Sequence, residues 1–265
     1  MVDIHAAILA PVSVLPGKLA LGEMEGRAVT RRLTVENHGA TDLELVLSHQ
    51  PAQSTGARPF EVQIAPGTAG VSFSPESLQV AAGQSASLDV TFTEPQALSE
   101  GGLFGGYLVL SPVGGGRQIR VPYLGMKGDY QHLVALNSDF TSFGNPLLIS
   151  GFEFGPSEPI TIYPAQGEVA TVVFHLDYAV RRLRVELFNA APGRAFGKLF
   201  EEGYFARNSG PEFFYSLTWG VRDADGIPVP AGAYSLRVSI QKALGEDDNP
   251  AHWEVWSSPS ITVVR

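Results

Sequence analysis

Apolar and polar residues alternate with a period of two along most of this chain, which favours strands that bury one face. The alternating apolar positions are Leu43, Leu45 and Leu47; Leu88, Val90 and Phe92; Ile119, Val121 and Tyr123; Val172, Phe174 and Leu176; Leu183, Val185 and Leu187; and Tyr234, Leu236, Val238 and Ile240. An antiparallel sheet with one face on the core and the other in contact with solvent requires this pattern. No stretch keeps a helical period long enough to predict a helix, although Val2–Leu9 and Gly197–Gly203 could each form a turn or two.

The number of strand candidates predicts an all-β fold. Segments such as Val29–Asn37, Ser77–Val80 and Tyr107–Ser111 bring the first half to seven or eight strands, the count of an Ig-like sandwich. A length of 265 residues allows two domains or one large sandwich. The second half shows the same alternation of apolar and polar residues as the first, without repeating its sequence. We therefore expect two sandwiches with a boundary just after Asp129. Residues 130–165 open the second sandwich or bridge it to the first.

Charge and composition exclude several classes of function. The formal net charge is −9, and both halves are acidic, so nucleic acid would be repelled and is excluded as a partner. The chain has no cysteine, which excludes disulfides and thiol catalysis. No apolar run approaches the roughly 20 residues of a membrane span, and Val2–Leu15 lacks the basic start of a signal peptide. We expect no membrane insertion.

The segment Val121-Pro122-Tyr123-Leu124-Gly125-Met126-Lys127-Gly128-Asp129, here called the V-P-Y segment, closes the first half. It resembles the V-P-Y-x-G-x-x-G-D signature that ends the fibronectin type III-like domain behind the catalytic domain of secreted subtilisin-like proteases. Leu19–Glu23, Val80–Ser85 and Gly101–Tyr107 resemble other parts of that domain, in family order. The resemblance implies a fibronectin type III-like sandwich over residues 17–129.

Upstream, Val2–Ile8 looks like the last helix of a subtilisin-like catalytic domain. The resemblance therefore implies that residues 1–16 are a remnant of that domain plus a linker. It also implies a location outside the cell or in the cell envelope.

A second resemblance lies in residues 219–234, here called the hairpin segment, whose signature positions are Trp219, Asp223, Gly226, Gly232 and Tyr234. They resemble the W-x-G-x-D-x-x-G-x-x-V-x-x-G-x-Y hairpin of Ig-like domains similar to that of the flagellar hook-capping protein, although Gly220 follows the tryptophan directly. The resemblance implies that residues 130–265 form an Ig-like sandwich. Physically the segment is a hairpin in which Asp223 and Asp225 cap a tight turn.

No catalytic constellation stands out. His38-Gly39 superficially resembles the subtilisin histidine motif, but it lies in a polar turn with no apolar helix after it. The six histidines show no zinc-ligand spacing. We expect His175, which points away from the apolar face of its strand, to be a surface or interdomain residue.

Two acidic loops and one aromatic cluster leave alternatives open. Residues 223–226 and 246–249 offer oxygen ligands to calcium, or they form a capped turn and a solvated loop tip. The aromatics Phe196, Phe200, Tyr204, Phe205, Phe213, Phe214, Tyr215 and Trp219 form a binding platform or, as we favour, core and domain interface. We predict no cofactor.

The sequence thus predicts a non-catalytic accessory region of a secreted subtilisin-like serine protease. It would space, shield or stabilise the catalytic domain of the same polypeptide and could bind protein or peptide substrate. The alternative is an independent extracellular adhesion or carbohydrate-binding module.

Overall fold

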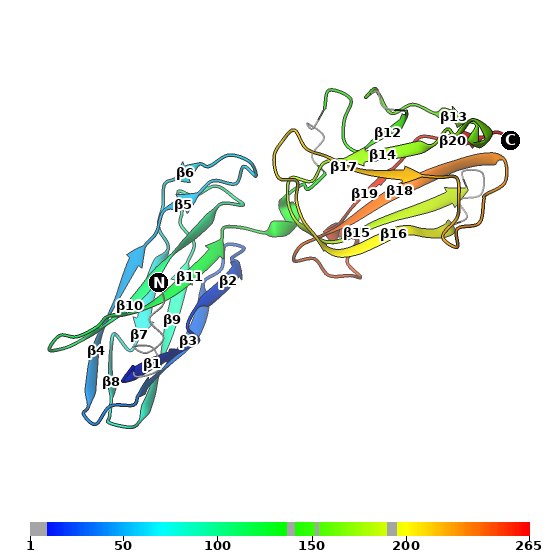
Figure 1. Ribbon diagram of the computed structural model, residues 1–265. Helices are drawn as coiled ribbons and strands as arrows, with labels where there is room; N and C mark the ends of the chain where they lie inside the picture. The colour runs from blue at the N-terminus through cyan, green and yellow to red at the C-terminus, as the bar shows by residue number, and fades with distance from the viewer. Residues whose placement is uncertain (1–9, 137–140, 152–153, 190–194) are drawn as a thin grey trace. The chain divides into compact units, whose positions relative to one another are not determined.

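The computed structural model describes residues 10–136, 141–151, 154–189 and 195–265. It confirms the all-β class, with two β-sandwiches of the predicted fibronectin type III-like and Ig-like kind (Figure 1). The chain divides into two compact units between Asp129 and Tyr130. Among the described residues, none of the helices could cross a bilayer. The Val2–Ile8 segment lies outside the described residues.

The first unit packs a four-stranded sheet, in the order β1-β3-β9-β7, against a second sheet, in the order β2-β11-β10-β4-β8, to which β5 and β6 add a short edge. Strand β2 runs parallel to β11, and the other pairs are antiparallel. The strands are β1 Val12–Leu15, β2 Leu19–Glu23, β3 Val29–Asn37, β4 Leu43–Pro51, β5 Ser54–Thr55, β6 Ile64–Ala65, β7 Gly70–Ser74, β8 Ser77–Val80, β9 Ser85–Thr93, β10 Leu103–Pro112 and β11 Ile119–Met126.

The core of the first unit comes from the alternating positions of these strands, with Leu33, Phe92 and Phe104 fully buried. At the end of β3 the buried Asn37 ties two turns together. Its Nδ2 donates to the carbonyl oxygens of Thr41 at 2.8 Å and Val80 at 3.0 Å, and its Oδ1 accepts from the backbone of Gly39. The amide is satisfied on both sides, as a buried polar group must be.

The second unit has a three-stranded sheet, β12-β14-β17, and a six-stranded sheet, β13-β20-β18-β15-β16, in which β19 also pairs with β18. Strand β13 runs parallel to β20. The elements are η1 Tyr130–His132, β12 Leu147–Ser150, β13 Ile160–Ile162, η3 Pro164–Gln166, β14 Ala170–Phe174, β15 Val180–Asn189, β16 Ala195–Phe205, β17 Tyr215–Trp219, β18 Gly232–Lys242, η4 Pro250–His252, β19 Trp253–Ser257 and β20 Ile261–Val263. The η elements are single 3₁₀ turns.

The segment that opens the second unit is held by a buried charge pair. Glu254 accepts hydrogen bonds from the backbone N–H groups of Ala135 at 2.8 Å and Leu136 at 2.9 Å. The ammonium of the buried Lys242 lies 3.6 Å from the same carboxylate and donates to the carbonyl oxygen of Gln131. Each charge is therefore compensated inside the unit.

Two expectations from the sequence differ from the structure. Val12–Leu15, assigned to the linker, is β1 and pairs with β3, so the first sheet begins before residue 17. Gly197–Gly203, where a helical turn was possible, is part of the long strand β16, and that prediction is wrong. Register shifts opposite β16 break the period of two, which explains why alternation did not identify it.

Candidate functional site

The V-P-Y segment forms the end of β11 and the turn after it. Val121 and Tyr123 point into the core, while Pro122 is exposed on the outer face of the sheet. Gly125 faces Phe104 so closely that a Cβ atom would lie 2.7 Å from the Phe104 ring. Gly128 has a φ of +79°, which favours glycine. The carboxyl-terminal residue of the segment, Asp129, stands at the division between the two units.

Tyr123 also makes a polar contact beneath the sheet surface. Its hydroxyl lies 2.6 Å from Nε2 of His49 on β4. Burial raises the pKa of Tyr123 to about 12 and lowers the pKa of His49, because both charged forms lose hydration. The pair is therefore a neutral hydrogen bond over the middle of the pH range.

Above this pair, β10 and β11, which lie side by side in Figure 1, form a shallow hollow of about 270 Å³ on the outer face of the sheet. Gly105, which has no side chain, lies at the bottom of the hollow. The exposed side chains of Leu103, Tyr107 and Leu124 form its walls. All side chains lining it within the described residues are uncharged. The hollow unites the V-P-Y segment with the glycine-rich segment Gly101–Tyr107.

The hairpin segment is held by short hydrogen bonds. Asp223 Oδ1 accepts from the backbone N–H groups of Asp225 at 3.0 Å and Ile227 at 2.8 Å. Gly226 has a φ of +77°. Trp219 and Tyr234 are buried with ring centroids 5.5 Å apart, at a tilt of 58°. The segment therefore forms a turn capped by Asp223, and Gly232 leads its second strand into the core.

The second acidic loop is bound to arginine side chains. Asp247 accepts from Arg182 at 3.0 Å and from Gln241 at 2.8 Å, and the Gly245 carbonyl accepts from Arg181 at 2.7 Å. Arg182 and Gln241 hold the pKa of Asp247 below its usual range, with the Gln241 hydrogen bond the larger cause. The positive charge that faces the Asp247 carboxylate is thus supplied by the guanidinium group of Arg182. No cluster of three His, Asp or Glu side chains suited to a metal ion occurs among the described residues.

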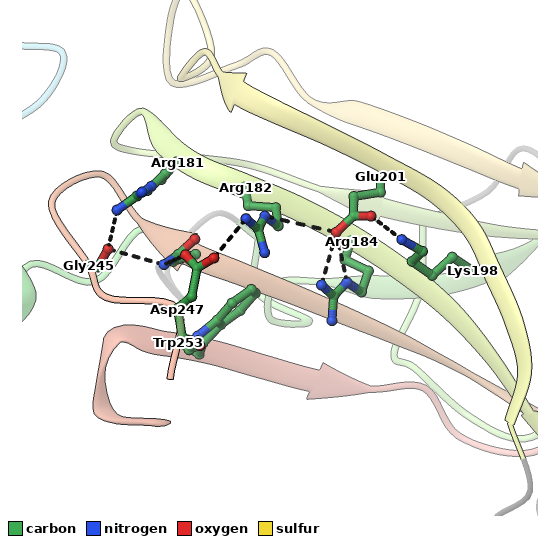
Figure 2. Close-up of polar contacts among 9 residues, drawn as sticks. Arg181, Arg182, Arg184, Lys198, Glu201, Gly245, Asp247 and Trp253 are labelled. Atoms are coloured by element: carbon green, nitrogen blue, oxygen red, sulfur yellow. Dashed lines mark hydrogen bonds and ion pairs between the residues drawn. The ribbon is translucent and has the colours of Figure 1, made fainter. Parts of the chain in front are cut away.

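These contacts belong to what we call the arginine–tryptophan cluster, made of Arg181, Arg182, Arg184, Lys198, Glu201, Asp247 and Trp253 (Figure 2). Glu201 accepts from Nε of Arg184 at 3.1 Å, from its Nη2 at 2.9 Å, and from Lys198. The indole of Trp253 lies beneath two guanidinium groups, 6.0 Å from Arg182 and 5.6 Å from Arg184. Sequence reasoning missed this cluster, because its members are spread over 73 residues and meet only through strand register.

The predicted aromatic cluster divides between core and surface. Trp219 is buried, and Phe196, Phe200, Phe205 and Tyr215 pack against the core. Three of the eight rings are exposed: Tyr204 at 89%, Phe213 at 51% and Phe214 at 46%. Phe214 meets Phe154 edge to face, with an interplanar angle of 73°.

Of the two alternatives for His175, a surface or an interdomain residue, the surface position is wrong, because only 2% of the residue is exposed. Its Nδ1 lies 2.5 Å from the carbonyl oxygen of Phe213, and its Nε2 lies 3.1 Å from Asp177. A carbonyl oxygen can only accept, so Nδ1 donates to it. The ring therefore anchors the loop that carries the exposed Phe213 and Phe214.

The comparisons with known proteins agree with the architecture of the first unit. Residues 19–124 match the Fn3-like domain family. This match runs from the start of β2 into β11. No curated protein sequence matches the chain.

Several solved structures show similarity at low identity. VesC, a secreted serine protease from Vibrio cholerae, is 13% identical with a TM-score of 0.35, and the alignment covers 97% of this chain and 52% of VesC. PapD-like domain 7 of human CEP192 is 19% identical with a TM-score of 0.35, covering 44% and 84%. The CupB2 chaperone of Pseudomonas aeruginosa is 14% identical with a TM-score of 0.28, covering 93% and 99%. None of these similarities carries information about function.

A serine–histidine contact joins β1 to the end of β3 in the first unit. Ser13 Oγ lies 3.1 Å from Nε2 of His38 and donates to Glu36 at 3.0 Å. In a catalytic triad the acid holds the opposite ring nitrogen from the serine, whereas Glu36 approaches the same Nε2 at 3.6 Å. All three side chains lie on a solvent-exposed surface. The contact is a surface hydrogen bond, and its geometry differs from that of a catalytic triad.

Proposed function

We propose that this chain is the non-catalytic accessory region of a secreted or cell-envelope subtilisin-like serine protease. The observation that carries the proposal is the V-P-Y segment at the end of a sandwich whose residues 19–124 match the Fn3-like domain family. In this role the two sandwiches space and stabilise the catalytic domain of the same polypeptide. Rigid sheets suit a spacer because few of their backbone groups are free to rearrange.

The hollow over Gly105 supports a part in binding protein substrate. It is uncharged and is lined by Leu103, Tyr107 and Leu124, so it suits an apolar side chain of an extended peptide. Tyr107 presents a hydroxyl at its rim that can bond to peptide backbone.

An independent extracellular adhesion or carbohydrate-binding module is the second candidate. The exposed rings of Tyr204, Phe213 and Phe214 favour it, because exposed aromatics are common at binding surfaces.

The coding sequence upstream of Val2 tests the first proposal. We expect it to encode the H-G-T and G-T-S-M-A motifs of a subtilisin-like catalytic domain. A signal peptide directly before Val2 would exclude the proposal and favour the second candidate.

A second test uses that longer protein. Removing residues 17–265 should lower its thermal stability and its hydrolysis of casein, while hydrolysis of a short chromogenic peptide is retained. Substituting Tyr107→Ala in the hollow should affect casein alone. The isolated chain should not cleave casein, and cleavage blocked by a serine-directed inhibitor would contradict the proposal.

A further inference from the structure

The outer face of the six-stranded sheet brings the arginine–tryptophan cluster together through strand register. Arg182 on β15 stands opposite Gln241 on β18, which stands opposite Trp253 on β19. In the next row, Arg184 stands between Glu201 on β16 and Ser239 on β18. The exposed Val255 ends this second row beside Trp253. The result is a flat surface with an aromatic and an aliphatic group along one side of two arginines.

The arginine–tryptophan cluster gathers cations on an acidic chain, beside a loop whose Glu246 and Asp248 add two exposed carboxylates. The cluster holds four cations, Arg181, Arg182, Arg184 and Lys198, against the two carboxylates of Glu201 and Asp247 (Figure 2). The whole chain carries a net charge of −9. The excess of cations within the cluster attracts anionic groups to the two arginines.

The guanidinium groups of Arg182 and Arg184 are fixed by hydrogen bonds, and each keeps N–H donors that are not engaged. Arg184 gives Nε and Nη2 to Glu201, and Arg182 gives Nη2 to Asp247. Within the described part of the chain, Nη1 of Arg182 and Nη1 of Arg184 make no hydrogen bond. Trp253 is fixed in turn, since its Nε1 donates to the carbonyl oxygen of Asp247 at 3.2 Å. Stacked guanidinium groups with free N–H donors are pre-organised to receive carboxylates.

The surroundings favour an acidic polysaccharide over an acidic peptide. The two arginines lie on β15, an interior strand between β16 and β18, so its backbone groups are committed to the sheet and cannot pair with an extended peptide. A ligand that lies across the arginines, between the edge strands β16 and β19, must therefore be recognised by side chains. An indole ring and Val255 can pack against the C–H faces of sugar rings, while the two arginines bind their carboxylates.

We propose that this face of the second unit binds a carboxylated polysaccharide, with Arg182 and Arg184 as the carboxylate ligands and Trp253 with Val255 as the apolar contact. The site is independent of the hollow in the first unit and of whether a protease domain precedes the chain.

The test measures binding of the full chain to polygalacturonate by affinity gel electrophoresis, with neutral dextran and poly-glutamate as comparison polymers. We expect retardation by polygalacturonate and not by dextran. The double variant Arg182→Gln with Arg184→Gln should weaken binding by roughly tenfold or more, since charge-assisted hydrogen bonds are lost. The matched control is Arg32→Gln, because Arg32 makes an equivalent surface ion pair with Asp89 in the first unit. This variant should bind normally.

Two further results decide the chemistry of the ligand. Trp253→Leu should weaken polygalacturonate binding while thermal unfolding shows an intact second unit, and where that variant unfolds, Val255→Ser serves instead. Raising the salt from about 0.1 M to 1 M should abolish binding, because the screening length falls from about 10 Å to 3 Å. Equal binding of poly-glutamate would overturn the polysaccharide in favour of an acidic protein. No binding of polygalacturonate, or binding unchanged by the arginine substitutions, would overturn the site.

Discussion

The two units bury polar groups in different ways. Within residues 10–129 the buried polar side chains are Asn37 and Ser54, both neutral. The second unit buries the titratable His175, Asp177 and Lys242, together with several neutral polar groups. Both units nevertheless share a design in which an early strand runs parallel to the last strand, β2 with β11 and β13 with β20.

Similar sandwiches can therefore depend on different interactions. A neutral amide contributes through hydrogen bonds that respond weakly to salt and pH. A buried charge needs its partner, because removing one member leaves the other without compensation. Single substitutions should therefore be costlier in the polar interior of the second unit than in that of the first.

Removing the carboxylate of Glu254 should have the largest effect. Glu254→Ala leaves the buried Lys242 unpaired and two backbone N–H groups without an acceptor. We expect a loss of about 3–5 kcal/mol in the free energy of unfolding of the second unit. The chain's three tryptophans, Trp219, Trp253 and Trp256, all lie in that unit, so fluorescence in a guanidinium titration reports it selectively.

The control for this substitution is Glu202→Ala, on the exposed side of β16, which should change the same transition by less than about 0.5 kcal/mol. A similar small change for Glu254→Ala would remove the contrast between the units.

Asn37→Ala tests the neutral counterpart in the first unit. It leaves the carbonyl oxygens of Thr41 and Val80 without their side-chain donor. We expect a loss of about 2–3 kcal/mol. Hydrogen exchange of peptides from residues 10–129 should accelerate, while the tryptophan transition of the second unit stays in place. The exposed Gln79→Ala on β8 is the control, and equal exchange in the two variants would show that Asn37 is dispensable.

The period of two was enough to predict most strands and the fold class, because alternation reports directly which face is buried. It predicted β3 and β8 over their full lengths, Val29–Asn37 and Ser77–Val80. It missed β16, where register shifts interrupt the period, and it left His175 as a surface or interdomain residue, whereas the residue is buried. The burial of His175 depends on Asp177 and on the carbonyl oxygen of Phe213, 38 residues away, and sequence spacing gives no sign of that contact.

Substituting a glycine in the V-P-Y segment or in the hairpin segment should lower the free energy of unfolding by a smaller amount. Gly125→Ala would place a Cβ atom 2.7 Å from the Phe104 ring, which overpacks the first core by about 2 kcal/mol. Gly226→Ala meets no atom within 4 Å, and only its left-handed φ of +77° is strained, at about 1 kcal/mol. Calorimetric unfolding of the two variants measures both losses in the free energy of unfolding. Phe104→Leu should partly rescue Gly125→Ala, and a lack of rescue would show that the close ring contact is not the cause.

The smallest expected effect is the acid response of the first unit through His49. Burial lowers its pKa from the ordinary value of 6.5, so the unfolded chain takes up this proton first as the pH falls. The stability contributed by neutral His49 is therefore full above about pH 6.5 and is lost as the pH falls through the folded pKa. His49→Gln can keep a hydrogen bond to Tyr123 and cannot titrate. Across that window, the first unit of the native chain should lose more stability than the first unit of the variant, by a small amount because solvent screens the half-exposed ring. The tryptophan transition of the second unit should be the same in both proteins at each pH, and parallel pH profiles for the first unit would exclude His49 as the source.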